Sequence, residues 1–405
     1  MDNVTHTIAG LVLADTLLLV RQARGATRTT ASLATAAATA GVVTANLPDA
    51  DLVYAGSVMG MGKLGYLLHH RGHTHTVLVA LVGAVLAWLV AVAWWRRKDD
   101  AATRVDGWWL LALCVAGTLS HLALDYTNSY GVHPFWPLDD RWYYGDAVFI
   151  VEPWLWVVAV PALLFAARAV GTRLLLAGLL VAALALAWSM RMVPQPVAVA
   201  LTLGTALSLV LAWRLSPRGR VAMMVGGWLA VEGVFFAASH AARRALGGPG
   251  VTDIVLSPGV SNPLCFTAYV VGMQGDRYAV TTATVAPAPR LHAVDGCPAG
   301  SRARDLGPAA RPGSAMVRWE YEWSGSRREL ATLARDNCVI AAALRFIRVP
   351  VWTRPDAATV RVADLRFGGG GFAEVIAPAH PTACPAHVPP WRPPAEAVFG
   401  GVVPR

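Results

Sequence analysis

Long apolar stretches recur through the first 245 residues, and short polar segments separate them. A helix that crosses a bilayer needs about 20 mostly apolar residues, or a few fewer inside a bundle. The second stretch is rich in Ala and Thr, small residues that permit close packing between helices in lipid. The pattern predicts eight spans, at residues 4–20, 31–47, 77–95, 107–127, 147–168, 173–191, 197–214 and 221–241.

Near Pro249 the pattern changes to short alternating runs separated by Pro and Gly, which is typical of β-strands. The sequence therefore predicts an all-α polytopic membrane bundle over residues 1–245 and a small, mostly-β domain over residues 250–376. The Pro-rich tail, residues 377–405, is predicted to be irregular and not to pack well. The expected elements of the domain are strands at Phe266–Val271, Tyr278–Val285, Met316–Trp323, Ala343–Val351 and Thr359–Phe367, with a helix near Arg328–Leu344.

The composition agrees with a membrane protein. Apolar residues make up 55% and charged residues 15%, against about a quarter charged in soluble domains, and the mean hydropathy is +0.47. The net charge of +9 does not indicate nucleic acid, because the cations cluster in short loops of the kind that set topology. These basic clusters are Arg21, Arg24 and Arg28; Arg96, Arg97, Lys98 and Arg104; Arg168 and Arg173; Arg214, Arg218 and Arg220.

The basic clusters occupy alternate loops, so all of them can be cytoplasmic at once. Both termini and the C-terminal domain then lie on the outer face of a bacterial-type inner membrane. Four of the five cysteines, Cys265, Cys297, Cys338 and Cys384, belong to that domain. An even number in an oxidising compartment favours disulfides, with three pairings open. Cys114 lies in a predicted span and is expected to be a small core residue.

Four histidines occur within seven residues just before the third span: His69, His70, His73 and His75. Imidazole nitrogens are ligands for zinc, iron, nickel and manganese. On a helix His69 and His73 would share one face, whereas Gly72 is equally compatible with a turn. An interfacial polar loop is the alternative interpretation.

His121 and Asp125 are four residues apart within the predicted span 107–127, so they share one helix face. A histidine and a carboxylate at that depth are costly in lipid and usually serve a function. The pair can bind a metal directly, or the carboxylate can orient the imidazole. A structural hydrogen bond between helices is the alternative.

Asp49 and Asp51 end the second predicted span, and His6 begins the first. Taken alone, these residues are ordinary features of helix ends. In the orientation that the arginines set, however, they fall on the same outer face as the histidine run and Asp125. His121 lies about one turn deeper on the helix of Asp125. Hydropathy and polar placement together therefore predict a metal site at the outer face.

At these residues the chain resembles the YdjM group of membrane-bound predicted metal-dependent hydrolases. Glu152 stands where an Asp is expected. The matching motifs keep a consistent order over residues 1–155: Met1-Asp2-Asn3-Val4-Thr5-His6, Leu47-Pro48-Asp49-Ala50-Asp51, His70-Arg71-Gly72-His73-Thr74-His75, His121-x3-Asp125-x2-Asn128-Ser129-Tyr130-Gly131, Trp136-Pro137, Asp146 and the carboxylate before Pro153.

That group is similar to the fold of zinc-dependent phospholipase C and P1 nuclease, in which His and Asp from several helices hold a zinc cluster. The resemblance implies a divalent metal, with zinc the expected ion. The residues that it implies as ligands are His6, Asp49, His69, His70, His73, His121 and Asp125.

The hypothesis from the sequence is metal-assisted hydrolysis of a phosphoester, including a lipid headgroup, at the outer membrane–water boundary. Asp51 or Asp125 would act as general base, and Arg71 would hold a phosphate oxygen. The expected partners are the lipid bilayer and such a substrate, with no nucleic acid. Two other classes stay open: a non-catalytic metal carrier or transporter, and a membrane scaffold whose outer domain binds another protein.

Overall fold

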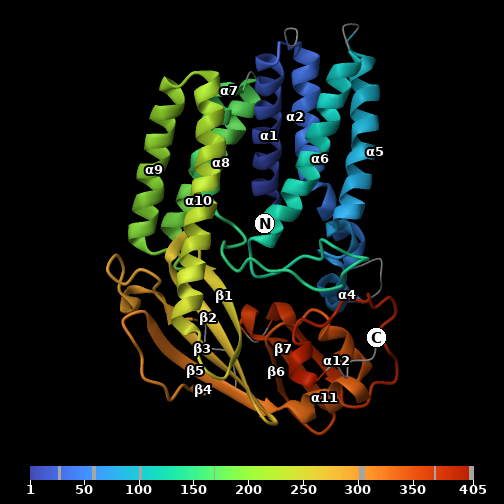
Figure 1. The fold of residues 1–405 in the computed structure, drawn as a ribbon, viewed down its shortest axis with the longest axis vertical. Coiled ribbons are helices and arrows are strands. Elements are labelled where there is room, and N and C mark those ends of the chain that lie inside the picture. The colour runs from blue at the N-terminus through green and yellow to red at the C-terminus, as the bar shows by residue number, and fades with distance from the viewer. Residues whose placement is uncertain are drawn as a thin grey trace.

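The computed structural model describes residues 1–25, 29–56, 61–99, 103–167, 169–300, 306–368 and 371–400. Long helices stand side by side in the first part of the chain, and a domain of strands and short helices lies at one end of them (Figure 1). The helical part consists of α1 (Asn3–Ala23), α2 (Ala31–Asn46), η1 (Leu47–Asp51), α3 (Leu52–Ala55), α4 (Gly62–His69), η2 (His73–His75), α5 (Val77–Arg96), α6 (Arg104–Tyr126), α7 (Pro153–Ala166), α8 (Val170–Ser189), α9 (Gln195–Arg214) and α10 (Pro217–Leu246).

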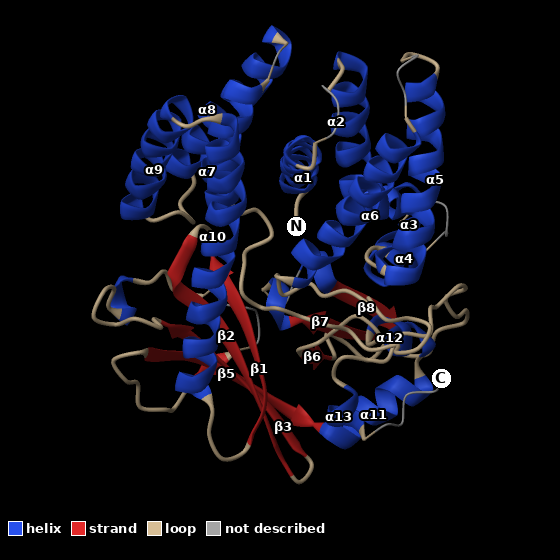
Figure 2. Ribbon diagram, turned by 45° about the horizontal axis from the view of Figure 1, so that its top comes forward, coloured by secondary structure: helices blue, strands red, loops and turns tan. Residues whose placement is uncertain are grey.

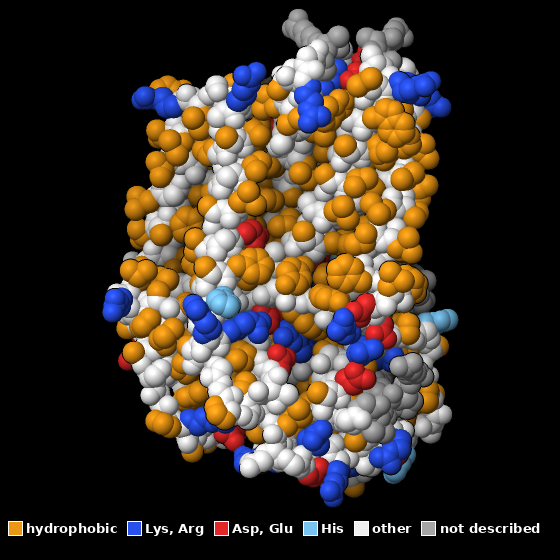
Figure 3. Space-filling view, in the orientation of Figure 1, with side chains coloured by type: hydrophobic (Ala, Val, Ile, Leu, Met, Phe, Trp, Pro, Cys, Tyr) orange, Lys and Arg blue, Asp and Glu red, His pale blue; other side chains and the backbone are white. Residues whose placement is uncertain are grey.

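Among the described residues, six helices are long and apolar enough to cross a membrane: α1, α5, α6, α8, α9 and α10. On the face drawn in Figure 3, apolar side chains form a band across the helices, with Lys and Arg at its edges. The chain is therefore a membrane protein with several spans. The helices at the two other predicted positions, α2 and α7, have only 16 and 14 residues, so the count of eight stays a prediction.

Small residues let α2 lie close to its neighbours, as its composition predicts. A Cβ atom on Gly10 of α1 would be 2.3 Å from the carbonyl oxygen of Gly41 in α2. A Cβ atom on Gly117 of α6 would be 2.2 Å from the hydroxyl of Thr44, also in α2. Such close approach is the usual way in which helices associate in lipid. It brings the end of α2 next to the last turns of α6.

The connections α1–α2 and α5–α6 lie at the end of the bundle away from the C-terminal domain (Figure 1). Arg21 pairs there with Asp106, with 2.5 Å between Nε and Oδ1. The segments after α2 and α6 lie at the opposite end, next to the C-terminal domain (Figure 2). Two members of the predicted basic clusters, Arg28 and Arg168, lie outside the described residues.

The C-terminal domain begins directly after α10 and contains two antiparallel sheets. One has the order β1-β2-β3-β5-β4 and the other β6-β7-β8. Helices α11 to α13 and short 3-10 turns complete the domain. Its elements are β1 (Val251–Gly259), β2 (Asn262–Gln274), β3 (Arg277–Val285), η3 (Val294–Gly296), β4 (Gly307–Pro308), β5 (Val317–Ser326), α11 (Arg327–Asp336), α12 (Cys338–Ala343), β6 (Pro350–Thr353), β7 (Thr359–Asp364), η4 (Leu365–Phe367), η5 (Gly371–Ala373), β8 (Glu374–Pro378) and α13 (Glu396–Phe399).

The predicted strand Ala343–Val351 is wrong for most of its length, because β6 begins only at Pro350. The residues before β6 form an apolar segment that is buried without joining a sheet, as Phe346 and Ile347 show. A short apolar run does not by itself separate a strand from a buried loop. The expected single helix is two, α11 and α12, since the side chain of Asn337 caps α12.

The cysteines of the domain form the pairs Cys265–Cys297 and Cys338–Cys384, and Cys114 is free and buried. The tail was expected not to pack, and here the structure differs. Trp391 is fully buried, and its indole nitrogen donates to the carbonyl oxygen of Leu68 at 2.9 Å. This large aromatic side chain thus packs the tail on the helical part, in addition to the disulfide at Cys384.

Candidate metal centre

Three segments bring polar side chains together at the end of the bundle that faces the C-terminal domain. The turn η1 carries Asp49 and Asp51 directly after α2. The turn η2 places His75 immediately before α5. The last two turns of α6 supply His121 and Asp125. Because α2 and α6 are in close contact, these three segments meet at one point.

Four of these residues, Asp49, His75, His121 and Asp125, form a buried group that could hold a metal ion, and we call it the tetrad. The Nε2 atoms of His75 and His121 are 3.1 Å apart. His75 Nε2 lies 3.3 Å from Asp49 Oδ1 and 3.2 Å from Asp125 Oδ2. His121 Nε2 lies 3.5 Å from each of the same two oxygens.

These separations match a tetrahedral ion. Ligand atoms at 2.0–2.1 Å from a tetrahedral zinc lie about 3.3–3.4 Å from one another. The five distances given above, between the imidazole nitrogens and from them to the carboxylate oxygens, fall between 3.1 and 3.5 Å. Two nitrogen and two carboxylate oxygen donors are also a ligand set that zinc accepts. The residues present therefore fit a divalent metal.

Hydrogen bonds to the other ring nitrogens fix the orientation of both imidazoles. His121 Nδ1 lies 2.6 Å from the carbonyl oxygen of Ala45, to which it must donate. His75 Nδ1 lies 3.3 Å from the Oδ2 atom of Asp51. With the Nδ1 proton held in this way, the neutral form of each imidazole directs the lone pair of Nε2 into the tetrad. This is the usual outer-shell arrangement of histidines that bind metals.

Asp51 lies beside the tetrad and is saturated with hydrogen bonds. Its Oδ1 atom is 2.9 Å from His70 Nδ1, and its Oδ2 atom accepts from the backbone N–H of Arg71 and from the hydroxyl of Thr74. A carboxylate so engaged orients its histidine neighbours. Burial opposes ionisation of Asp51, but the hydrogen bonds with His70 and His75 outweigh it and lower the pKa of this carboxyl.

Replacement of Asp51 by Asn tests this positioning role. An amide cannot accept on both sides, so His75 loses a partner that fixes its ring. We expect metal affinity to fall by about 10–100-fold, as for other outer-shell partners of ligands. Titration with zinc, monitored by competition with a chromogenic chelator, measures the change. The exposed-loop variant Asp139→Asn serves as the control, and equal affinities in the two variants would speak against the role.

The hydrogen bonds within the tetrad shift the pKa values of His75 and Asp49. Burial alone would lower the pKa of His75, but hydrogen bonds to Asp125, Asp49 and Asp51 raise it to about 10. Burial likewise opposes ionisation of Asp49, whereas its hydrogen bonds with His121 and His75 lower its pKa. Without a metal, a proton on His75 therefore takes the place of a cation among the carboxylates.

Arg71 is buried against the tetrad, with its Nη2 atom 2.9 Å from Asp125 Oδ1. Its backbone adopts a left-handed conformation with φ of 61°, and its Nη1 atom donates to Asn128 Oδ1 at 3.0 Å. The Nε atom of Arg71, the amide nitrogen of Asn128 and the hydroxyl of Tyr130 have no hydrogen-bond partner among the described residues. Buried donors of this kind call for an acceptor.

The other histidines expected as ligands occupy different places. His6 stacks on His121 with 3.7 Å between ring centroids, and its Nε2 atom lies 3.3 Å from Asp125 Oδ1, on the carboxylate oxygen that faces away from the tetrad. His69 and His73 do not join the tetrad; the ring of His73 packs against Trp136 and Trp391. His75 does join it, although it was the one histidine of the run that was not among the ligands expected from the sequence.

Two further groups of donor residues occur in the described part of the chain. Asp49, Asp51 and His70 lie within ligand distance of one another and share Asp49 with the tetrad. Cys265, His292 and Cys297 also lie together, but the two cysteines form a disulfide and do not offer thiolates. The first group alone could extend the centre to a second ion.

The C-terminal domain covers this centre. Arg366 donates to the carbonyl oxygen of Ser129 at 2.6 Å, and Arg348 pairs with Asp146 at 3.0 Å. Trp391 stacks on His133 with ring centroids 4.0 Å apart. Burial lowers the pKa of His133 to about 3, so this imidazole is neutral under the indole. The aromatic loop after α6 is thus held beneath the domain.

Comparison with known proteins adds one positive finding. Residues 1–195 match the family model described as YdjM inner membrane protein, and these residues include α1 to α8 and every residue of the tetrad. A search of the curated proteins and a search of the solved structures each found no match. The expected likeness to the phospholipase C and P1 nuclease fold therefore gains no support from solved structures.

Proposed function

We propose that this chain, whose residues 1–195 match the YdjM inner membrane protein family, is a membrane-embedded hydrolase that uses a divalent metal, with zinc the preferred ion, on a phosphoester. The observation that carries the proposal is the tetrad: four buried donor atoms at the separations of a tetrahedral site. A divalent cation bound there would compensate the buried carboxylates of Asp49 and Asp125.

When bound, a divalent ion at the tetrad supplies a Lewis acid that polarises a phosphoryl oxygen and lowers the pKa of water. Arg71, Asn128 and Tyr130 would bind and orient the phosphate, since each has a buried donor atom without a partner. Asp125 connects the metal site with the phosphate-binding residues. Its Oδ2 atom belongs to the tetrad, and its Oδ1 atom pairs with Arg71. Asp51 would orient His75 rather than take up a proton.

The tetrad and the C-terminal domain are proposed to lie on the outer side of the membrane. The α1–α2 and α5–α6 connections, which carry basic residues, lie at the opposite end of the bundle, as a cytoplasmic side requires (Figure 1). The two disulfides of the domain are typical of an oxidising compartment. Together these features support a site at the outer membrane–water boundary.

Metal binding should release a proton at neutral pH. The pKa of His75 in the metal-free protein is raised to about 10, whereas a metal needs the neutral imidazole. Below that pKa, affinity is expected to rise about tenfold for each unit of increasing pH, and to level off as the pH passes the pKa of His75. Calorimetric titration in buffers of different ionisation enthalpy counts the protons released. An affinity independent of pH between 6 and 9 would contradict this protonation state.

The proposed activity is tested with purified, zinc-reconstituted protein and the soluble substrate bis(p-nitrophenyl) phosphate. We expect metal-dependent hydrolysis in the wild type and in His73→Ala, and its loss in Asp125→Ala. Metal content is measured on the same samples. Bound metal without hydrolysis would favour a metal carrier over an enzyme. If no metal is bound, the remaining hypothesis is a membrane scaffold whose outer domain binds another protein.

A further inference from the structure

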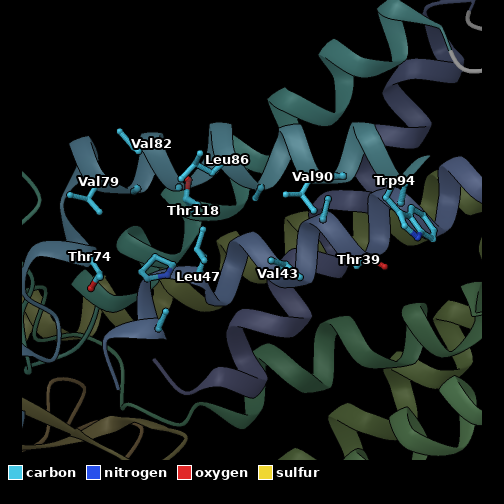
Figure 4. Close-up of a pocket in the computed structure, with 18 of the residues that line it drawn as sticks. Thr39, Val43, Leu47, Thr74, Val79, Val82, Leu86, Val90, Trp94 and Thr118 are labelled. Carbon is cyan, nitrogen blue, oxygen red and sulfur yellow. The ribbon is translucent and has the colours of Figure 1, made fainter. Parts of the chain in front are cut away.

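We infer that a groove between α2 and α5 holds one hydrocarbon chain of a membrane phospholipid and presents its headgroup phosphate to the tetrad. The inference rests on the proposed function and names the substrate class of the same site. The groove has a volume of about 720 Å³ and is lined almost entirely by apolar side chains (Figure 4).

Small residues on both helices form the floor and walls of the groove. α2 contributes Ala36 and Ala40, and α5 contributes Gly83, Ala87 and Ala91. Larger residues such as Val43 and Val90 lie along it and remain partly exposed. In a membrane this surface faces lipid, not water. A recess of this kind is therefore filled by hydrocarbon.

The groove has the dimensions of a lipid chain. Its lining runs along α2 from Thr35 to Leu47 and along α5 from Val79 to Trp94. At a rise of 1.5 Å per residue these stretches are about 18 and 22 Å long. One leaflet of a bilayer contributes about 15 Å of hydrocarbon, half of the total thickness of about 30 Å. A fully extended acyl chain can thus lie in the groove from the membrane boundary inward.

One end of the groove lies next to the segments η1 and η2 that carry the candidate metal centre. Pro48 and Ala50 line it, and Asp49 of the tetrad lies between them. Thr74 also lines it and donates its hydroxyl to Asp51 at 2.7 Å. Asp49 is 9% exposed, whereas the other tetrad residues are fully buried.

The chemistry along the groove changes from apolar to ionic in one direction. A ligand that fits must be hydrophobic over about 20 Å and anionic at one end. A metal ion in the tetrad and the unpartnered donors of Arg71 and Asn128 provide the matching positive end. A helix from another protein would fill the apolar part alone. A phospholipid satisfies both parts, with its second chain left in the bilayer.

The test uses the full chain in phosphatidylglycerol vesicles in which one acyl chain carries a diazirine at its terminal carbon. After photolysis, we expect labelled peptides from residues 35–47 and 79–94 at higher yield than from the lipid-facing surface of α8. Ala87→Phe places a ring in the groove, whereas Val85→Phe places the same ring on a part of α5 that does not line it. Labelling of residues 35–47 should be lost in Ala87→Phe, because the ring occupies the space of the acyl chain, and stay unchanged in Val85→Phe.

Val43→Phe fills the groove from α2 and repeats the test if Ala87→Phe misfolds. Hydrolysis of soluble bis(p-nitrophenyl) phosphate and metal content are measured on each variant, and Val85→Phe, which lies outside the groove, should match the wild type in both. Equal labelling of α2 and α8, equal effects of the two α5 variants, or photolytic linkage to a second protein chain in place of lipid would each overturn the inference. Loss of hydrolysis or metal in the wild type, with groove labelling intact, would instead refute the proposed function.

Discussion

Replacing His75 by alanine is expected to abolish metal binding, whereas replacing His73, two residues earlier, should leave it unchanged. His75 Nε2 lies within 3.1 to 3.3 Å of three other donor atoms of the tetrad. His73 points to Trp136 and Trp391 instead. Removing a ligand should cost more than the roughly 10–100-fold loss of affinity that follows removal of an outer-shell partner.

The measurement is the zinc content of each purified variant after reconstitution and dialysis, by elemental analysis. His69→Ala provides a second control from the same run of histidines. Folding is checked by thermal unfolding, because His75 also pairs with carboxylates in the metal-free state. If His75→Ala keeps its metal while His73→Ala or His69→Ala loses it, the tetrad is the wrong assignment.

Replacing Arg366 by alanine is expected to destabilise the protein strongly and to loosen the C-terminal domain from the helical part. The guanidinium is buried and donates to Asp364 at 2.7 Å, while its Nη1 atom reaches the carbonyl oxygen of Ser129 in the loop after α6. Removal would leave the fully buried carboxylate of Asp364 without its counter-charge. Breaking a buried pair in this way typically costs about 3–5 kcal/mol.

Thermal unfolding in detergent and limited proteolysis of the domain measure the effect. The matched control is Arg141→Ala, which removes the partner of Asp139 from an exposed pair and should change neither observable measurably. If Arg366→Ala unfolds at the wild-type temperature, the contact with Ser129 does not hold the domain in place.

The sequence predicts some parts of this molecule well because the signal is local. Apolar runs of about 20 residues locate most of the spans, since length in lipid is a one-dimensional property. His121 and Asp125 share a face because helical periodicity requires it. Asp49 is expected near His121 and Asp125, because the second and fourth predicted spans end on the same side of the membrane.

Other features of the structure depend on contacts between residues far apart along the chain, which the sequence pattern does not reveal. Which histidine of the run joins the tetrad is decided by the left-handed backbone at Arg71 and by the turn η2. The anchoring of the tail depends on the bond from Trp391 to Leu68, 323 residues away along the chain. Neither spacing nor composition contains information about such pairs, so these features emerge only from the three-dimensional structure.

The central claim is that the tetrad binds a metal ion, and X-ray absorption at the zinc edge of the reconstituted wild-type protein tests it most directly. We expect one zinc with four nitrogen or oxygen ligands at about 2.0–2.1 Å and the multiple-scattering signature of two imidazoles. That signature should disappear in His75→Ala. A spectrum with sulfur ligands, or one that is identical in wild type and His75→Ala, would contradict the account.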